Sequence, residues 1–274
     1  MTDFLTPLMN TPLMDAGCPW CDPKYLAEFA GTMFLLIFGN GVCANASLMK
    51  TKGNKGGFFM VVSGWAIGVA LVVFMFMRSS GAHFNPAITV TFALAGNFPW
   101  HDVVPYLVAQ FAGAFCGAVF VYLVYFKHFQ ATEDGDDKLG LFCTMPAIRS
   151  PLCNCLTEIL ATAALLFVVS GLGYAAKDTA DAGAKLFDPG FSALCVGMLI
   201  LAIGLALGGP TGFAINPARD LGPRFAHFIL PMKNKRDSDW GYAWVPIVGP
   251  MIGGVLGYLM WYAIFGARTL PEMM

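Results

Sequence analysis

The stretch SGAHFNPA at residues 80–87 decides the fold, because its last three residues return in GFAINPARD at residues 212–220. Asparagine is favoured just before a helix, and proline fits best at the first helical position, where its missing N–H is not needed. Each triplet, Asn85-Pro86-Ala87 and Asn216-Pro217-Ala218, therefore predicts the start of a helix. Two short helices that begin at matching places in the two halves of a membrane protein indicate a translocation site.

The composition predicts an integral membrane protein. Of the 274 residues, 57% are hydrophobic and 12% are charged, which is about half the charged share of a soluble domain. The mean hydropathy of +0.64 agrees. The net charge of -1 comes without a basic cluster, so no nucleic-acid partner is expected. Residues 1–23 contain no Lys or Arg and no continuous apolar segment, so no secretory signal is expected there.

Six apolar stretches have the length of about 20 residues that crosses a bilayer. They are residues 25–43, 58–77, 104–126, 152–174, 191–208 and 243–265. The stretches 86–95 and 217–229 are shorter, and at about 1.5 Å per residue they cover only about half of a bilayer core. The approaches at 79–84 and 209–215 must therefore line an aqueous cavity or be buried in protein. The sequence predicts six spanning helices and two re-entrant half-helices.

The two halves of the chain repeat one design. Glu28 precedes Asn85, and Glu158 precedes Asn216, at nearly the same spacing and near the start of the first span of each half. A unit of three spans and one half-span crosses the membrane an odd number of times, so its second copy enters from the opposite side. This inverted repeat brings the half-helices together at the middle of the membrane. Coincidental triplets in surface loops are the alternative.

The two stretches around the triplets closely resemble the signature segments of the major intrinsic proteins, the aquaporins and aquaglyceroporins. The resemblance covers nearly the whole chain and is closest to the bacterial glycerol facilitators. It implies an all-α membrane channel with the aquaporin-like fold, assembled as a homotetramer, with no enzymatic activity, cofactor or metal. The expected boundaries are an extension at 1–23, one channel domain at 24–268 and a tail at 269–274. Within the domain, a linker at 127–151 joins repeats at 24–126 and 152–268.

The resemblance and the helix dipole together give Asn85 and Asn216 a role. Each half-helix turns its positive end and its free N–H groups toward the middle of the membrane, where both side-chain amides can donate to a passing oxygen. That oxygen has then used its lone pairs, so a file of waters points its hydrogens outward. Proton hopping and cation leakage are both opposed. Each asparagine can still cap its helix through its carbonyl oxygen.

By resemblance, backbone carbonyls form a ladder of acceptors along one side of the pore. They belong to Gly81, Ala82, His83, Phe84, Gly212, Phe213, Ala214 and Ile215. The opposite wall is expected to be apolar. A linear polyol suits such a pore, because it has hydroxyls along one edge and C–H groups along the other.

Arg219 is the clearest single candidate, because burial and the helix dipole both disfavour a cation in the first turn of a half-helix. An arginine at the membrane interface is the alternative. By resemblance, Arg219 belongs to a selectivity filter with Trp65, Gly204 and Phe213, and its guanidinium can donate to two adjacent hydroxyls. Water-selective members generally have a histidine where Gly204 stands. Asp220 also matches the glycerol-conducting branch.

Glu28 and Glu158 are carboxylates within apolar spans, where an unpaired charge is costly. The resemblance implies that each accepts hydrogen bonds from a re-entrant loop and braces it. The alternative is a proton relay, which would make the protein a coupled transporter.

Four of the eight cysteines form two short clusters. Cys18 with Cys21, and Cys153 with Cys155, look like fragments of a metal or redox site. The expected topology puts the two clusters on opposite sides of the membrane, which excludes one four-cysteine zinc site. Free thiols without a role are expected, and a redox or metal-binding role of Cys18 with Cys21 in an oligomer is the alternative.

The sequence predicts a passive channel for glycerol, small polyols, urea and water that excludes ions and protons. A water-selective aquaporin, a proton-coupled transporter and a structural or adhesive membrane protein are the alternatives. The expected location is the plasma (inner) membrane, as a multi-pass protein in the lipid bilayer with both termini in the cytoplasm. The positive-inside rule favours the opposite orientation, because this topology places only five of the 16 Lys and Arg inside: Lys24, Arg78, Lys177, Lys185 and Arg268.

Overall fold

The computed structural model describes residues 22–181 and 189–266. Every regular element within these residues is a helix, and six of the helices are long and apolar enough to cross a membrane. They are α2 (Pro23–Ser47), α3 (Gly57–Ser80), α5 (Trp100–Val124), α8 (Pro151–Asp181), α9 (Pro189–Leu207) and α11 (Val245–Phe265). Large apolar side chains face outward from them, such as Leu123 at 65% and Met75 at 69% exposure. The predicted all-α membrane fold is confirmed.

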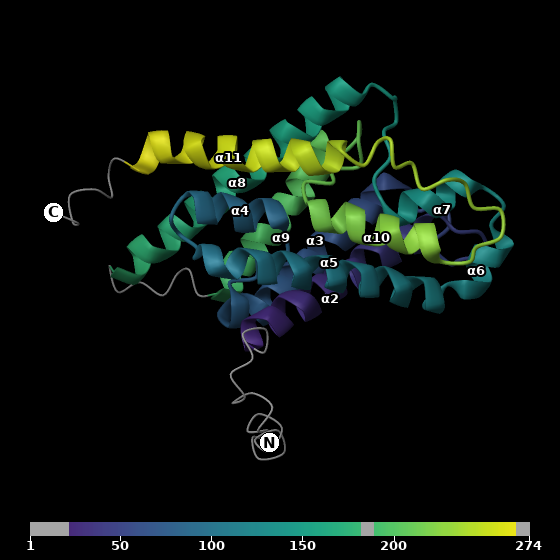
Figure 1. Cartoon of the computed structure of the whole chain (residues 1–274), viewed down its shortest axis with the longest axis horizontal. Coiled ribbons are helices and arrows are strands. Elements are labelled where there is room, and N and C mark those ends of the chain that lie inside the picture. The colour runs from purple at the N-terminus through teal and green to yellow at the C-terminus, as the bar shows by residue number, and fades with distance from the viewer. Residues whose placement is uncertain (1–21, 182–188, 267–274) are drawn as a thin grey trace, which may run out of the picture.

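The two predicted half-helices are α4 (Pro86–Leu94) and α10 (Pro217–Ile229). Both begin at the proline of a triplet, with the preceding asparagine in extended conformation as the N-cap. Figure 1 shows α4 and α10 in opposite halves of the long axis of the molecule. Because both capped ends point to the centre, the N–H groups and the positive dipole ends of two helices meet there.

The same helix pairing occurs in both repeats. In the first, α2 packs along α5, and in the second, α8 packs along α11. Glycines make the close approach possible: a Cβ added to Gly113 would lie 2.2 Å from the carbonyl oxygen of Phe29. A Cβ added to Gly257 would lie 2.2 Å from that of Ala163. Small residues let helix backbones touch in a membrane, where no hydrophobic effect drives helices together.

Two features differ from the sequence expectation. Helix α5 begins at Trp100, before the apolar stretch that starts at 104, because Asp102 in its first turn is paired. The Asp102 carboxylate accepts hydrogen bonds from Lys24 Nζ at 2.8 Å and from Tyr25 Oη at 2.5 Å. The linker at 127–151 also holds two unpredicted helices, α6 (Phe126–Ala131) and α7 (Gly135–Phe142). The N-cap of α7 is Asp134, whose side chain accepts from the Asp136 N–H at 2.7 Å.

The remaining sequence expectations fall where the structure describes little or nothing. The extension at 1–23 lies outside the described residues except for its last two, and so does the whole tail at 269–274. Cys18 and Cys21 belong to that undescribed part. Cys153 is exposed and Cys155 is buried near the start of α8. Among the described residues, no group of three or more His, Cys, Asp or Glu could hold a metal ion.

Candidate functional site

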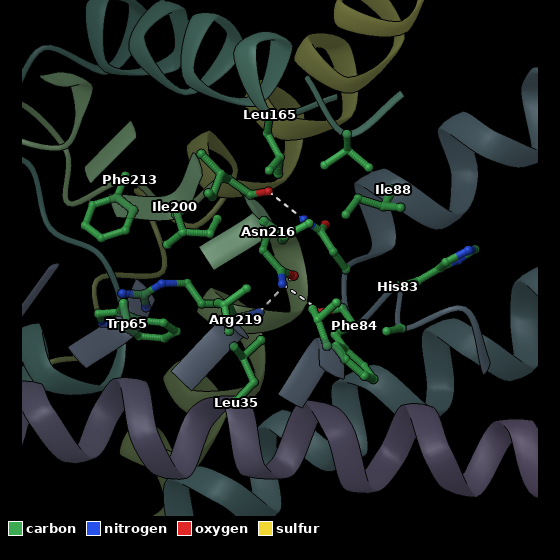
Figure 2. A pocket seen from close by; sticks show the side chains of 18 residues that line it. Leu35, Trp65, His83, Phe84, Ile88, Leu165, Ile200, Phe213, Asn216 and Arg219 are labelled. Carbon is green, nitrogen blue, oxygen red and sulfur yellow. Dashed lines mark hydrogen bonds between the residues drawn. The ribbon is translucent and has the colours of Figure 1, made fainter. Parts of the chain in front are cut away.

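A narrow cavity of about 80 Å³ lies where the two re-entrant loops meet. Figure 2 shows Phe213, Trp65 and Arg219 at one end of it and Phe84 and His83 at the other. The predicted residues that line it are Trp65, Ala82, His83, Phe84, Asn85, Phe213, Ala214, Ile215, Asn216 and Arg219. The other lining residues are all apolar: Leu35, Val69, Val73, Ile88, Leu165, Val169, Val196 and Ile200. Of the predicted residues, Gly81, Gly204, Gly212 and the Pro-Ala pairs of both triplets do not line it.

Each triplet asparagine links its own half-helix to the opposite loop. Asn85 Oδ1 accepts from the Ala87 N–H at 2.9 Å, while Asn85 Nδ2 donates to the Ile215 carbonyl at 2.8 Å. Asn216 Oδ1 accepts from the Ala218 N–H at 3.0 Å, and its Nδ2 donates to the Phe84 carbonyl at 2.8 Å. Each amide has a second hydrogen, because an asparagine NH₂ group carries two donors. Helix capping and donation to the cavity are therefore compatible.

The backbone of both loops takes an unusual conformation at alternate residues. Ala82 and Phe84 in the first loop have φ of 54° and 50°, and Phe213 and Ile215 in the second have 41° and 46°. Positive φ is disfavoured for residues with a Cβ, and it persists only where the surroundings hold it. Such strain concentrates at functional sites. The two loops therefore need a specific brace.

Glu28 and Glu158 supply that brace by the same geometry in both repeats. Glu28 accepts from the N–H groups of His83 at 2.9 Å and Phe84 at 2.8 Å. Glu158 accepts from the N–H groups of Ala214 at 3.0 Å and Ile215 at 2.8 Å. Both carboxylates are buried. Neither lines the cavity, so their contacts are to the loops and not to its contents.

Hydroxyl and amide side chains complete the brace, and sequence reasoning missed them. Ser80 Oγ and Gln110 Nε2 donate to Glu28 at 2.7 and 2.8 Å, and Thr211 Oγ1 donates to Glu158 at 2.6 Å. Gln110 stands within an otherwise apolar stretch, and an amide at such a position is a signal that could have been used. The His83 ring reaches α4, where its Nδ1 lies 3.1 Å from Thr89 Oγ1.

The candidate filter places a cation against an aromatic face. The guanidinium carbon of Arg219 lies 4.4 Å from the centre of the Trp65 ring, within the range of a cation–π contact. Arg219 is buried, and its Nη1 has no hydrogen-bond partner among the described residues. The indole N–H of Trp65 donates to Cys43 Sγ at 3.4 Å. A buried arginine therefore lines the cavity, beside a ring that is fixed.

Gly204 does not line the cavity, but it lies next to the Phe213 ring, which does. A Cβ at Gly204 would lie 2.4 Å from Val62 Cγ1 and 3.2 Å from Phe213 Cζ. A larger residue there would displace Val62, because real Cβ atoms essentially never approach to 2.4 Å, and it would also crowd the Phe213 ring at 3.2 Å. Trp65 and Phe213 are both almost completely buried, yet both line the cavity. They form the apolar side of the constriction, and Arg219 forms its polar side.

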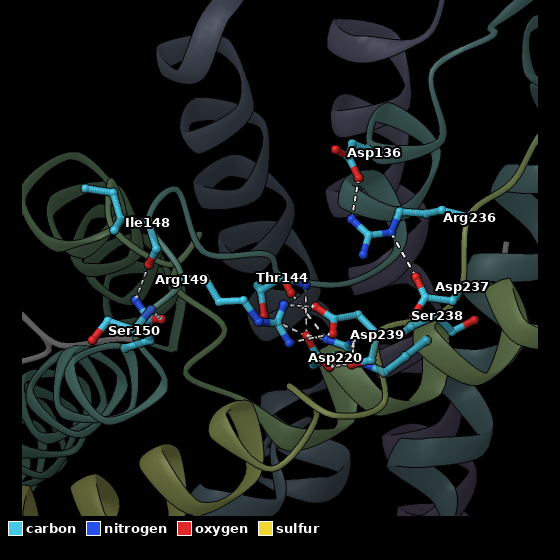
Figure 3. A network of polar contacts seen from close by, with 12 residues as sticks. Asp136, Thr144, Ile148, Arg149, Ser150, Asp220, Arg236, Asp237, Ser238 and Asp239 are labelled. Carbon is cyan, nitrogen blue, oxygen red and sulfur yellow. Dashed lines mark hydrogen bonds and ion pairs between the residues drawn. The ribbon is translucent and has the colours of Figure 1, made fainter.

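Asp220 lies outside the cavity, in a buried polar network (Figure 3). It accepts from Thr144 Oγ1 at 2.6 Å and from Arg224 Nε at 2.8 Å. Arg224 in turn donates to the carbonyls of Ser238 at 2.8 Å and Asp239 at 3.0 Å. Asp220 thus anchors the helix that carries Arg219 to two outer loops. Sequence reasoning missed Arg224, although its i, i+4 spacing from Asp220 favours a pair.

The outer end of this network is a second ion pair. Arg149 donates two hydrogen bonds to the Asp239 carboxylate, both at 2.8 Å. These bonds hold the pKa of Asp239 below its ordinary value. The pair connects the segment before α8 to the segment before α11.

Comparison with known proteins agrees with this geometry. The sequence pattern of the family described as "Major intrinsic protein" matches residues 21–261. The probable glycerol uptake facilitator protein of Thermotoga maritima is 52% identical over 241 residues, which cover 88% of this chain and 99% of that one. The glycerol uptake facilitator protein of Bacillus subtilis is 46% identical over 241 residues, covering 88% and 84%.

A solved structure is also similar. The aquaglyceroporin from Plasmodium falciparum matches with a TM-score of 0.77 and 30% sequence identity, covering 90% of this chain and 97% of that chain. The family pattern and both relatives extend over most of the chain. The chain therefore belongs to the major intrinsic protein family.

Proposed function

We propose that this protein is a passive membrane channel, not an enzyme, that conducts glycerol, other small uncharged solutes such as small polyols or urea, and water. The observation that carries the proposal is one end of the cavity, where the Arg219 guanidinium carbon lies 4.4 Å from the centre of the Trp65 ring and Phe213 lines the same space. The similarity to glycerol uptake facilitators supports glycerol as the solute.

The two sides of the cavity suit the two sides of a polyol. Arg219 and the amides of Asn85 and Asn216 donate to hydroxyl oxygens, and the loop carbonyls accept hydroxyl hydrogens. Carbon atoms slide along the aromatic corner and the apolar side chains. A water needs roughly 10–15 Å³ of such a cavity, so 80 Å³ holds a short file of waters or one small solute. Solutes therefore pass singly.

Ions and protons are excluded by charge and by orientation. Among the described residues that line the cavity, Arg219 alone has a permanent charge, and two positive helix ends face the centre of the cavity. A cation meets repulsion and no carboxylate to replace its water shell. Waters that accept from the asparagine amides point their hydrogens away from the centre, which interrupts a chain of proton transfers.

The arrangement argues against the two main alternatives. A water-selective pore calls for a larger, polar side chain at Gly204, whereas here Val62 and the Phe213 ring occupy the space beside that glycine. A proton relay through Glu28 or Glu158 would need a carboxylate that faces the cavity, whereas all four carboxylate oxygens accept hydrogen bonds from loop or helix groups. The loop-bracing role is therefore the one we assign to both glutamates.

The domain boundaries belong to the same proposal. One channel domain at 24–268 contains the repeats at 24–126 and 152–268, and the linker carries α6 and α7. The repeated pairing of α2 with α5 and of α8 with α11 supports this division.

We also propose a homotetramer in the plasma membrane with both termini in the cytoplasm. The positive-inside rule disagrees, but several of the eleven outer cations are used as structural contacts. Lys235 Nζ donates to three carbonyls at the end of α10, at 2.7 to 2.9 Å, and Lys138 Nζ donates to the Lys233 carbonyl. Arg219 and Arg224 are buried. Such residues are retained for the fold, so they weaken the count of loop charges as evidence of orientation.

Swelling of proteoliposomes in a glycerol gradient, without any ion gradient, tests the proposed function. A passive channel gives the same glycerol rate when a pH difference is imposed across the membrane and when a protonophore then collapses it. A rate that depends on the proton gradient would instead indicate a coupled transporter.

A further inference from the structure

The Phe213 ring is contacted by a residue that the filter of four residues leaves out. Phe58, in the first turn of α3, meets Phe213 edge to face, with ring centres 6.2 Å apart and planes at 86°. This is the favoured geometry of an aromatic pair. Phe213 itself has a positive φ of 41°, so its backbone is strained and its ring needs contacts that fix its position.

The two rings fill space that α9 leaves open. A Cβ at Gly208 would lie 2.6 Å from Phe213 Cδ1 and 3.1 Å from Phe58 Cζ. Both rings therefore converge on Gly208, which directly follows the end of α9 at Leu207. Gly204 limits the Phe213 ring on one side, and Phe58 supports it from the outer side. If Phe58 were removed, the Phe213 ring could move outward into the vacated space and widen the constriction.

The exposure of Phe58 separates this role from ordinary core packing. Its side chain is 44% exposed, and it borders an outer hollow together with Lys55, Val61 and Asp137. The next residue, Phe59, is 68% exposed and has no ring contact with Phe213 among the described residues. Truncation of a half-exposed side chain costs less stability than truncation in a core, and Phe59 is a matched control at the same helix end.

We propose that Phe58 is a positioning residue of the filter, which holds the Phe213 ring and thereby limits the width of the solutes that pass. This inference rests on the proposed glycerol channel and adds Phe58 as a fifth residue that determines which solutes the channel admits. It predicts that Phe58 acts on the ratio of wide to narrow solutes and not on the total rate alone.

The test measures the proteoliposome permeability of glycerol and of trimethylolethane, a branched triol with the same number of hydroxyls and a greater width. Phe58→Ala should raise the ratio of branched triol to glycerol by about threefold or more, the range of an aromatic pair coupling. Phe58→Tyr should restore the wild-type ratio, because it keeps the ring. Phe59→Ala should leave the ratio unchanged. The ratio is internal to each preparation, so a smaller amount of folded channel does not alter it.

The outcomes separate this inference from the proposed function. If wild-type protein does not accelerate glycerol entry, the proposed function fails. If the wild type conducts glycerol and Phe213→Ala raises the ratio but Phe58→Ala and Phe58→Leu do not, the inference is overturned and the channel stands. An equal rise with Phe59→Ala would also overturn it, since the effect would then be general to this helix end.

Discussion

Asn85 and Asn216 each bind the loop that carries the other: the Asn85 amide donates to the carbonyl of Ile215, and the Asn216 amide donates to that of Phe84, both at 2.8 Å. Each repeat thus completes the loop of the other at the middle of the membrane. The centre of the pore is therefore one structural unit built from both halves, and a change at either asparagine affects both loops.

We first predict that Asn216→Asp disrupts this unit. The aspartate can still cap α10, because its oxygen can accept from the Ala218 N–H, but it places an acceptor against the Phe84 carbonyl. The loss of a buried donor should lower the stability by about 1–3 kcal/mol. It should also abolish most of the glycerol conduction. Thermal inactivation of the detergent-solubilised protein and proteoliposome swelling measure the two effects.

Asn97→Asp is the control for that substitution, because Asn97 donates to Tyr258 Oη at an exposed position. It should change neither property measurably. Equal effects at both sites would show that the central contact has no special role.

The second prediction concerns Gly204. Gly204→Ala adds a Cβ 2.4 Å from Val62 and 3.2 Å from the Phe213 ring, so it should push the ring into the pore. Glycerol permeability should fall at least about tenfold relative to water, the effect of roughly 1.4 kcal/mol. Phe213→Ala in the same chain should recover part of the loss, because residues in contact are not additive. Stopped-flow light scattering gives both rates, and a double variant with additive effects would place Gly204 away from the filter.

The buried Asp220–Arg224 pair leads to the third prediction. Arg224→Met leaves the Asp220 carboxylate without its cation, although Thr144 still donates to it, and should cost about 3–5 kcal/mol. The double variant Asp220→Asn with Arg224→Met removes both charges and should be more stable than Arg224→Met alone. Thermal denaturation in detergent ranks the three proteins. A double variant that is less stable than Arg224→Met would show that the two charges do not act as a pair.

The fourth prediction follows from the pKa of Asp239, which the hydrogen bonds from Arg149 lower. A carboxylate with a lowered pKa stabilises the folded loop above its ordinary pKa of about 4 and loses this contribution as the pH falls through the lowered value. Hydrogen exchange of residues 236–244, corrected for the intrinsic effect of pH, should therefore stay slow at neutral pH and become faster below about pH 4. Arg149→Gln should reduce the increase in exchange rate at low pH. An unchanged increase would show that another titrating group causes it.

Most of the membrane architecture could be predicted from the sequence, because the energetic requirements are local. A long apolar stretch must span, and an Asn-Pro pair before a short one starts a half-helix, as α4 and α10 do. The apolar pattern places the start of α5 too late in the sequence, because Asp102 in its first turn is paired with Lys24 and Tyr25, which are distant in the sequence. The helices of the linker were missed because a polar segment lacks the hydrophobic pattern used elsewhere.

The site was predictable where one residue carries the chemistry and not where several share it. Arg219 and the asparagines stand out as polar groups in an apolar context. Gln110 and Arg224 carry local signals, an amide in an apolar stretch and an i, i+4 spacing from Asp220, but these signals do not identify the distant groups that they bind, Glu28 and the Ser238 carbonyl. Phe58 looks like one more apolar residue at a helix start, and only its contact with Phe213 distinguishes it from Phe59.

The most direct test of the central claim compares glycerol and water permeability of the same wild-type proteoliposomes with those of protein-free liposomes. The claim that Arg219, Trp65, Gly204 and Phe213 form a polyol-admitting filter predicts that the protein accelerates glycerol entry as well as water flow. Acceleration of water flow alone, with glycerol entry no faster than in protein-free liposomes, would contradict it.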